Sequence, residues 1–347
     1  ADEASSPRSP PRPRGPTGGR SGATDGSPRA PFESAKCAWL RDACKVEAID
    51  YKNENVATRL KALAPKGVDV FFDNVGGVTL DFAEGVPDAP VKVEVARHWK
   101  AMPSGGSTGV PKVIVDHRPA AFDPDRPVLG TPRDGIVLNP GPLYHNAPFS
   151  ISFNALIRGC TIVGMRRFEA LDALRLIERH RVQVVNFVPT MMHRMWPLPK
   201  ELRSACDLSS LERVWHMAAP MPPWLKRAWI DWLGADRIWE LYGGTENTGS
   251  TEISGSEWLK KPGSVGRPAA GARIRAQDET GVPLAAGEVG ELYFMPVGGP
   301  RSTYHYIGAT AREDDAGWDS IGHSGWVDAD GYVFLADRRT GLIISGG

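Results

Sequence analysis

The sequence has few cysteines, no net charge and no long hydrophobic run, and each absence narrows the class of protein. The 41 basic and 41 acidic residues cancel, so charge gives no reason to expect a nucleic-acid or membrane-surface partner. No apolar run approaches the roughly 18 residues of a membrane span. The cysteines lack Cys-x-x-Cys or Cys/His metal spacing, which favours reduced thiols in a cytoplasmic protein. They are Cys37, Cys44, Cys160 and Cys206.

What the sequence does contain is three stretches of different character. Residues 1–35 are rich in Pro, Ser, Arg and Gly. They cannot bury enough apolar surface to offset the entropy of ordering, so we expect a disordered tail, with a proline-rich ligand arm as the alternative. Residues 36–81 alternate helical and strand-like patterns, residues 82–97 form a junction, and residues 98–347 have the patterns of one enzyme region.

The enzyme region alternates strands and helices before it becomes rich in strands. Residues 160–165 and 182–189 are apolar strand patterns, and residues 171–181 between them form an amphipathic helix, which predicts a βαβ unit. A second helix is predicted over residues 222–234, because two prolines open it and a glycine stops it. From about residue 262 the pattern predicts β-structure. Together these patterns predict an α/β fold.

The stretch SGGSTGVPK (104–112) predicts a phosphate-binding loop of an unusual kind. A Walker loop places its lysine directly after the last glycine so that a helix begins there. Here Val110 and Pro111 intervene, and the following segment VIVD is strand-like. The expected structure is a glycine and hydroxyl loop that leads into a strand. Its Ser107 and Thr108 hydroxyls and its backbone N–H groups would surround a triphosphate.

The loop is one of three ordered motifs, together with YGGTE (242–246) and DADGYVFLADRRTGLIISGG (328–347). In this order the motifs resemble those of the adenylate-forming, or AMP-binding, superfamily. Three further stretches are similar to the fatty-acid and bile-acid CoA ligase branch: PGPLYHNAPF (140–149), FVPTMMHRM (187–195) and AAPMPPWLKRAWIDWLG (218–234). The resemblance covers about residues 98–347.

The resemblance implies part of the large N-terminal domain of that fold, with βαβ sheets and a C-terminal β-rich part. It implies that a carboxylate is activated by ATP and Mg²⁺ as an acyl-adenylate and then passed to coenzyme A. The branch implies a small, hydrophobic carboxylic acid as substrate. Because the sequence stops at Gly347, within the hinge motif where Thr340 occupies the hinge position, we expect the small C-terminal domain to be absent and turnover to be impaired.

The resemblance also implies roles for individual residues. The catalytic residues would be Lys112, Thr245, Glu246 and Arg338, with the Glu246 carboxylate as the Mg²⁺ ligand. The ATP- or AMP-binding residues would be Ser104, Ser107, Thr108, Gly109, Ala218, Ala219, Pro220, Tyr242, Gly243, Gly244 and His323. The acyl pocket would be lined by His145, Phe187, Val188, Pro189 and Thr190.

One of these residues departs from the family pattern. The family grips the ribose with the aspartate of a GDxGW motif, whereas this sequence has IGHSGW with His323 at that place. A neutral imidazole has one acceptor, so we expect weaker nucleotide binding. Loss of a charged hydrogen bond typically costs about 1.5–3 kcal/mol.

Residues 36–81 resemble a different family, the zinc-independent, NADP-dependent medium-chain reductases. There the residues matching Lys36 and Tyr51 approach the adenosine 2′-phosphate, and the residue matching Asn74 lies near the nicotinamide. The glycine-rich turn that should carry the pyrophosphate is absent. Two alternatives therefore stand beside the ligase hypothesis: an NADP-dependent oxidoreductase fragment, or a non-catalytic chimeric fragment.

Overall fold

The fold is seen in a computed structural model, which describes residues 37–38, 41–42, 47–49, 53–63, 97–104, 112–123, 125–269 and 271–336. The expected disordered tail, and most of the reductase-like block, lie outside these ranges. Within that block, helix α2 (Val56–Leu63) confirms the helix expected over VATRLKAL. A strand is expected near AIDY, but residues 47–49 adopt no regular secondary structure.

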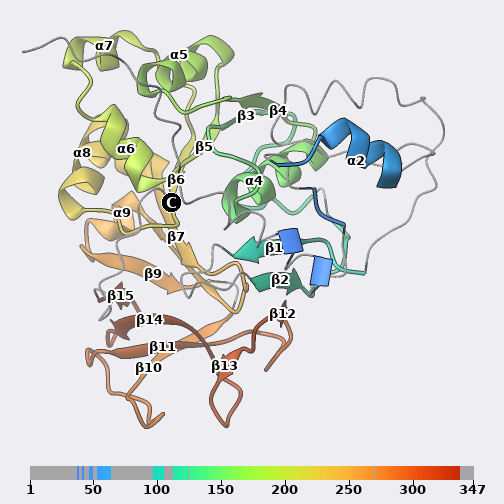
Figure 1. Ribbon diagram of the computed structural model, residues 1–347. Coiled ribbons are helices and arrows are strands. Elements are labelled where there is room, and N and C mark those ends of the chain that lie inside the picture. The colour runs from blue at the N-terminus through green and yellow to red at the C-terminus, as the bar shows by residue number, and fades with distance from the viewer. Residues whose placement is uncertain are drawn as a thin grey trace, which may run out of the picture.

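Five parallel strands form the half of the main sheet that carries the helices (Figure 1). Their spatial order is β4-β3-β5-β6-β7, and each neighbouring pair is parallel. Parallel neighbours require crossover connections, and a helix supplies each one. The strands are β3 (Ile136–Asn139), β4 (Thr161–Gly164), β5 (Val184–Phe187), β6 (Arg213–His216) and β7 (Ile238–Gly243).

The crossover helices cover both faces of this parallel half. They are α4 (Asn146–Ile157), α5 (Ala170–His180), α6 (Pro189–Met195), α7 (Lys200–Ala205) and α8 (Pro223–Leu233). Helices α5, α6 and α8 share one apolar core with the sheet, whereas α4 packs on a second core around Val137 and Trp215. The predicted βαβ unit is confirmed as β4-α5-β5, and the predicted second helix is confirmed as α8.

The rest of the main sheet is antiparallel and follows β7 in the order β8-β9-β15-β14-β11-β10, with β13 beside β14. This part confirms the β-rich region expected from about residue 262. It encloses a third core around Leu292, Phe294 and Val333. Its elements are β8 (Ser250–Ser254), β9 (Ser264–Pro268), β10 (Arg273–Gln277), β11 (Gly290–Met295), β13 (Arg312–Glu313), β14 (Asp319–Val327) and β15 (Val333–Leu335), with short helices η1 (Ala235–Arg237) and α9 (Gly255–Trp258).

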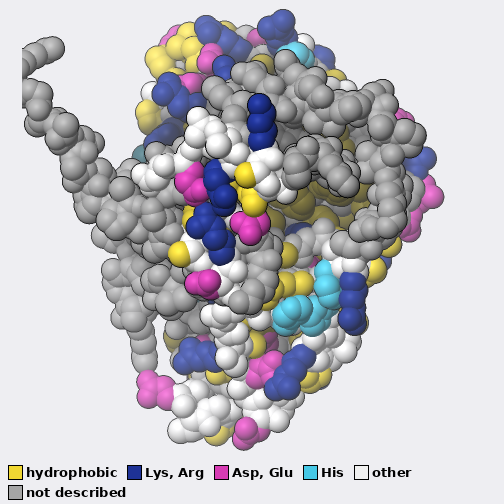
Figure 2. All heavy atoms as spheres, turned by 45° about the vertical axis from the view of Figure 1, so that its right-hand side comes forward, with side chains coloured by type: hydrophobic (Ala, Val, Ile, Leu, Met, Phe, Trp, Pro, Cys, Tyr) yellow, Lys and Arg dark blue, Asp and Glu magenta, His cyan; other side chains and the backbone are white. Residues whose placement is uncertain are grey.

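A separate antiparallel sheet joins segments that are far apart in the sequence: β1 (Ala101–Ser104), β2 (Lys112–Asp116) and β12 (Tyr304–Ile307). Strand β2 confirms that Lys112 leads into a strand and not into a helix. Beyond β2, the His117 Nε2 lies 2.8 Å from the His305 Nδ1, and the ring of His98 packs against both. A group of histidine side chains is visible on one face of the molecule (cyan in Figure 2). Among the described residues, no helix has both the length and the hydropathy to span a bilayer.

Candidate active site

The predicted binding segments follow parallel strands at the same edge of the sheet. The segment with His145 follows β3, residues 188–190 follow β5, residues 218–220 follow β6, and residues 244–246 follow β7. Carboxyl ends of parallel strands lie together, and this edge is where α/β proteins bind ligands. The topology therefore gathers four motifs that are widely separated in the sequence.

The lysine of the glycine-rich motif lies beside the glutamate of YGGTE. The Lys112 Nζ is 3.6 Å from the Glu246 Oε1, although Lys112 begins β2 of the small sheet and Glu246 follows β7 of the main sheet. Tyr306 of β12 joins the two groups, because its hydroxyl donates to the Glu246 Oε1 at 2.7 Å and its ring lies 3.7 Å from the Lys112 Nζ. Glu246 is only 8% exposed, so its charge is held in place by these two partners.

A second buried carboxyl lies next to this group. Asp319 at the start of β14 is buried, and its Oδ1 has no hydrogen-bond partner among the described residues. Burial raises the pKa of Asp319 to about 6, to which the charges of Glu313 and Glu246 contribute, against the opposing effects of the nearby Tyr304 hydroxyl and of Lys112. Burial also raises the pKa of Tyr306, as does the nearby Glu246. The site is therefore a partly dehydrated cluster of charged groups.

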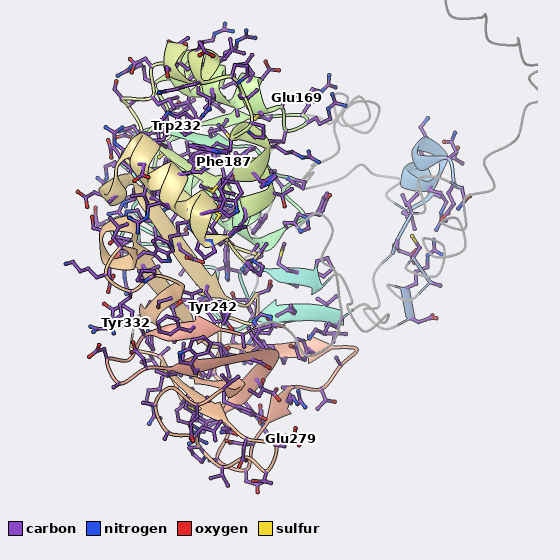
Figure 3. The ribbon with its side chains drawn as sticks, turned by 90° about the vertical axis from the view of Figure 1, so that its left-hand side faces the viewer. Glu169, Phe187, Trp232, Tyr242, Glu279 and Tyr332 are labelled. Carbon is purple, nitrogen blue, oxygen red and sulfur yellow. The ribbon has the colours of Figure 1, made fainter. Side chains whose placement is uncertain are left out.

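The two segments predicted to enclose adenine differ in exposure. Ala218 and Pro220 are exposed, whereas Tyr242 is buried. Ala218 has φ +73°, a left-handed conformation that costs a non-glycine residue about 1–2 kcal/mol. The Tyr242 hydroxyl lies 2.9 Å from the His323 Nδ1. In Figure 3, Tyr242 lies where the α/β part with Phe187 meets the β-rich part with Glu279.

Gly244 is required by the close packing of this corner. A Cβ at Gly244 would lie 2.7 Å from the Glu246 Oε2 and 3.2 Å from the side chain of Ile321. Without that carbon the backbone of Gly244 can lie close to the Oε2, while the Oε1 accepts from Tyr306. A side chain at position 244 would therefore displace the Glu246 carboxylate.

The residues predicted to line the acyl pocket lie in different environments. His145 is exposed at the N-cap of α4, with its ring 4.7 Å from that of Tyr144, and partial burial lowers its pKa. Val188 is half-buried, Thr190 is exposed and Pro189 is buried. Phe187 is 0% exposed and packs in the core against Phe168 and Trp229. The acyl-pocket role stays a prediction for all five residues.

Several predicted site residues lie outside the described ranges: Ser107, Thr108, Gly109 and Arg338. Ser104 ends β1 directly opposite Lys112 in the strand register. Sequence reasoning missed Tyr306 and Asp319. The alternating tyrosines of TYHYIG were the available signal, since they mark one face of a strand, but nothing in the sequence indicates that this face meets Lys112.

The fold and the site have the arrangement of a nucleotide-binding α/β enzyme domain, with polar loops at the carboxyl edge and a lysine–carboxylate pair beside them. A profile of the AMP-binding enzymes matches residues 57–306. The chain belongs to this family. The match begins within residues 36–81, the block expected to be a reductase fragment, 41 residues before the predicted start of the enzyme region at residue 98.

Curated relatives of the chain are acyl-CoA ligases. It is 32% identical over 269 residues to the feruloyl-CoA synthase of Amycolatopsis sp, covering 75% of this chain and 53% of that protein. It is 29% identical over 324 residues to the 2-succinylbenzoate–CoA ligase of Bacillus pumilus, covering 92% of this chain and 62% of that protein. The chain thus spans between half and two thirds of the length of these relatives.

Solved structures share the fold. The o-succinylbenzoate coenzyme A synthetase (MenE) of Bacillus subtilis, in complex with ATP and magnesium, superposes with a TM-score of 0.62 at 24% identity, covering 77% of this chain and 56% of that one. At this identity the likeness concerns the fold alone. It confirms the predicted α/β architecture with a mixed sheet.

Proposed function

We propose that the chain binds ATP and activates a carboxylate as an acyl-adenylate, the first half of an acyl-CoA ligase reaction. The observation that carries this proposal is the contact of Lys112 and Glu246 across two sheets, 3.6 Å apart and joined by Tyr306. A basic group and a carboxylate at this edge suit a ligand that brings phosphate and a metal cation together. Membership of the AMP-binding family supports the same ligand.

The proposed chemistry is mainly positioning and charge neutralisation. A carboxylate is a poor electrophile because its leaving group would be oxide, and converting that oxygen to AMP supplies a good leaving group. In this proposal Lys112 neutralises the departing pyrophosphate, together with Ser104, Ser107, Thr108 and Gly109 of its loop. Thr245 donates to the α-phosphate, and Arg338 reaches the nucleotide from the hinge segment.

Glu246 fits a role as ligand to a magnesium ion. Mg²⁺ prefers carboxylate oxygen and is commonly held by one or two carboxylates together with substrate phosphates. The Oε2 of Glu246 borders the backbone of Gly244, where a side chain would fill the space, and the Oε1 is oriented by the Tyr306 hydroxyl. When bound, the metal would supply positive charge to the phosphates.

The names of the relatives support the choice of acid and of acyl acceptor in this proposal. Their names specify ferulate and succinylbenzoate as the acids and coenzyme A as the acceptor, which supports a small carboxylic acid and coenzyme A here. The proposal has three finer parts. The acid is hydrophobic and binds near His145, the reaction takes place in the cytoplasm, and turnover is reduced. To His323, which replaces the carboxylate expected at the ribose, we attribute weaker nucleotide binding.

The NADP-dependent oxidoreductase is the alternative proposal, and it rests on residues 36–81. Of the elements expected in that block, the structure describes helix α2, which is compatible with either hypothesis. The two proposals differ in the nucleotide that they require. A non-catalytic chimeric fragment would show no pyrophosphate exchange, whether or not it binds a nucleotide.

Thermal unfolding with nucleotides and a pyrophosphate-exchange assay test the proposal. We expect MgATP, but not NADPH, to raise the melting temperature, because a ligand that binds only the folded state stabilises it by mass action. We expect ATP–pyrophosphate exchange that depends on an added carboxylic acid and is lost in Glu246→Gln. The matched control is Glu212→Gln. Glu212 directly precedes β6, at the edge of the sheet opposite to the edge where Glu246 lies. Stabilisation by NADPH alone would contradict the proposal.

A further inference from the structure

A buried ionic group lies on three elements that lead into the candidate adenine segments, residues 218–220 and 242–244. The Lys226 Nζ donates a hydrogen bond to the Glu240 Oε2, and the His216 Nε2 lies 3.8 Å from the same oxygen. The three residues are 1%, 7% and 0% exposed, respectively. One carboxylate oxygen is therefore hydrogen-bonded to the lysine and lies close to the imidazole inside the protein.

Each member belongs to an element that leads into a candidate adenine segment. His216 is the last residue of β6 and directly precedes residues 217–220. Lys226 lies in the first turns of α8, which begins three residues after Pro220. Glu240 lies in β7 opposite His216 in the register and two residues before Tyr242. The carboxylate is thus connected to both ends of the first segment and to the start of the second.

The energetics argue that this group is not kept for stability. Burial raises the pKa of Glu240 and lowers the pKa of Lys226, while the mutual attraction of the pair opposes both shifts. Burial and the charge of Lys226 hold the pKa of His216 well below its ordinary value. Apolar residues of similar volume often stabilise a core as well as a buried ion pair does, and in some proteins a buried pair instead specifies geometry.

Two further observations indicate that the geometry is held under strain. Ala218, two residues after His216, has φ +73°, and such conformations persist where the surroundings over-determine them. Neither ring nitrogen of His216 has a hydrogen-bond partner among the described residues. Burying a polar group without a partner costs free energy, so the structure tolerates a cost at this position.

We propose that the Lys226–Glu240 pair, with His216 packed beside it, forms a positioning network that sets the separation of residues 218–220 and 242–244, and so the affinity for an adenine ring. The inference rests on the proposed nucleotide-binding function and adds to it residues that do not touch the ligand. The network ties α8 and β6 to β7, so the two walls around the base move as one unit.

The test replaces the pair by apolar residues and compares two ligands. In Lys226→Met/Glu240→Leu we expect AMP to bind at least tenfold more weakly, while inorganic tripolyphosphate with Mg²⁺ binds within twofold of wild type. We expect an unchanged or higher melting temperature. The control is Arg181→Met/Asp207→Asn, which removes an exposed ion pair of the same α/β part and should change neither affinity. Titration calorimetry measures both ligands.

A second variant keeps the test decisive if the double variant does not fold. Glu240→Asp retains the charge but withdraws the carboxylate by one methylene, and we expect several-fold weaker AMP binding with unchanged tripolyphosphate binding. Unchanged AMP affinity in either variant, or an equal loss for both ligands, would overturn the network's positioning role alone. Failure of the wild-type chain to bind AMP would instead overturn the proposed function, and the inference with it.

Discussion

Tyr306 is the residue that couples the lysine and the glutamate of the candidate site. Its hydroxyl orients the Glu246 carboxylate and its ring faces the Lys112 ammonium. Removal of such an outer hydrogen bond typically weakens metal affinity by 10–100-fold. We expect Tyr306→Phe to raise, at least tenfold, the Mg²⁺ concentration that gives half-maximal ATP–pyrophosphate exchange, and Tyr306→Leu to raise it further because the ring over Lys112 is also lost.

Tyr293→Phe is the matched control for this prediction. Tyr293 lies in β11 of the β-rich part, so the same hydroxyl is removed away from the site. A Mg²⁺ dependence in Tyr306→Phe equal to that of Tyr293→Phe would show that the hydroxyl does not orient a metal ligand.

His323 occupies the position at which the family pattern has a ribose-binding aspartate, and its Nδ1 is already engaged by Tyr242 at 2.9 Å. A carboxylate accepts from both ribose hydroxyls, whereas a neutral imidazole has a single acceptor nitrogen. We therefore expect His323→Asp to bind AMP about 10–100-fold more tightly, the range that corresponds to about 1.5–3 kcal/mol. The binding of 2′,3′-dideoxy-AMP should not improve. An equal gain for both nucleotides would rule out a ribose contact.

Asp319 gives the molecule a pH-dependent stability. Because burial raises its pKa to about 6 in the folded state from an ordinary value of 3.8, the folded chain binds the proton more tightly than the unfolded chain. Stability is then lost as the pH rises from about 4 to about 6, by at most about 3 kcal/mol. We expect Asp319→Asn to raise the melting temperature at pH 7.5 but not at pH 4.

The exposed Asp315 lies on the same segment, and Asp315→Asn is the control for this prediction. The same pH-dependent gain in both variants would indicate a general effect of net charge. A melting temperature of Asp319→Asn below that of the wild type at pH 7.5 would mean that the ionised carboxylate has a stabilising partner.

At the scale of elements, α8 carries two apolar stripes, Trp224/Ala228/Trp232 and Leu225/Trp229/Leu233, and all three residues of the second stripe are buried. Trp229 is 1% exposed, whereas Trp224 is 53% exposed. Deletion of a buried aromatic side chain typically costs about 3–5 kcal/mol, and deletion of an exposed one costs little. We expect Trp229→Ala to lower the free energy of unfolding by this amount in denaturant titrations. Trp224→Ala, on the same helix, should stay within about 0.5 kcal/mol of the wild type.

The same helix shows which structural features could be predicted from the sequence. The prolines at its start and Gly234 at its end are local signals, and the structure begins and ends α8 there. The choice between the stripes of Trp224 and Trp229 depends on how the helix is rotated against the sheet, which is a tertiary property. The same limit applies to Phe187, because an apolar residue at a strand end faces either a pocket or a core.

The lysine–glutamate pair also shows that local motifs could be predicted from the sequence, whereas long-range contacts could not. The motifs around Lys112 and Glu246 identified both residues as site candidates, because each motif is continuous in the sequence. Tyr306 belongs to no such motif and meets them because β12 pairs with β2, strands that are almost two hundred residues apart. A contact of this kind follows from the complete sheet topology and not from any local pattern.

At the scale of the whole molecule, the candidate site joins the small sheet to the main sheet. Lys112 begins β2, whose partner β12 carries Tyr306, while Glu246 and residues 218–220 follow strands of the main sheet. A ligand that contacts both sheets should suppress the opening of both, whereas a ligand that contacts only the adenine segments should act on the main sheet alone. Amide hydrogen exchange distinguishes these cases, because local opening sets exchange rates.

We therefore expect MgATP to slow exchange in β2 and β12 as well as in residues 217–220 and 243–247. AMP without metal should slow exchange in the two adenine segments and leave β2 and β12 unchanged, because it brings neither the β- and γ-phosphates nor the cation to Lys112 and Glu246. Strand β10, at the edge of the main sheet away from the parallel half, is the internal reference. Equal protection of β2 by AMP and by MgATP would mean that the lysine–glutamate contact does not depend on phosphate, and would separate this contact from the nucleotide site.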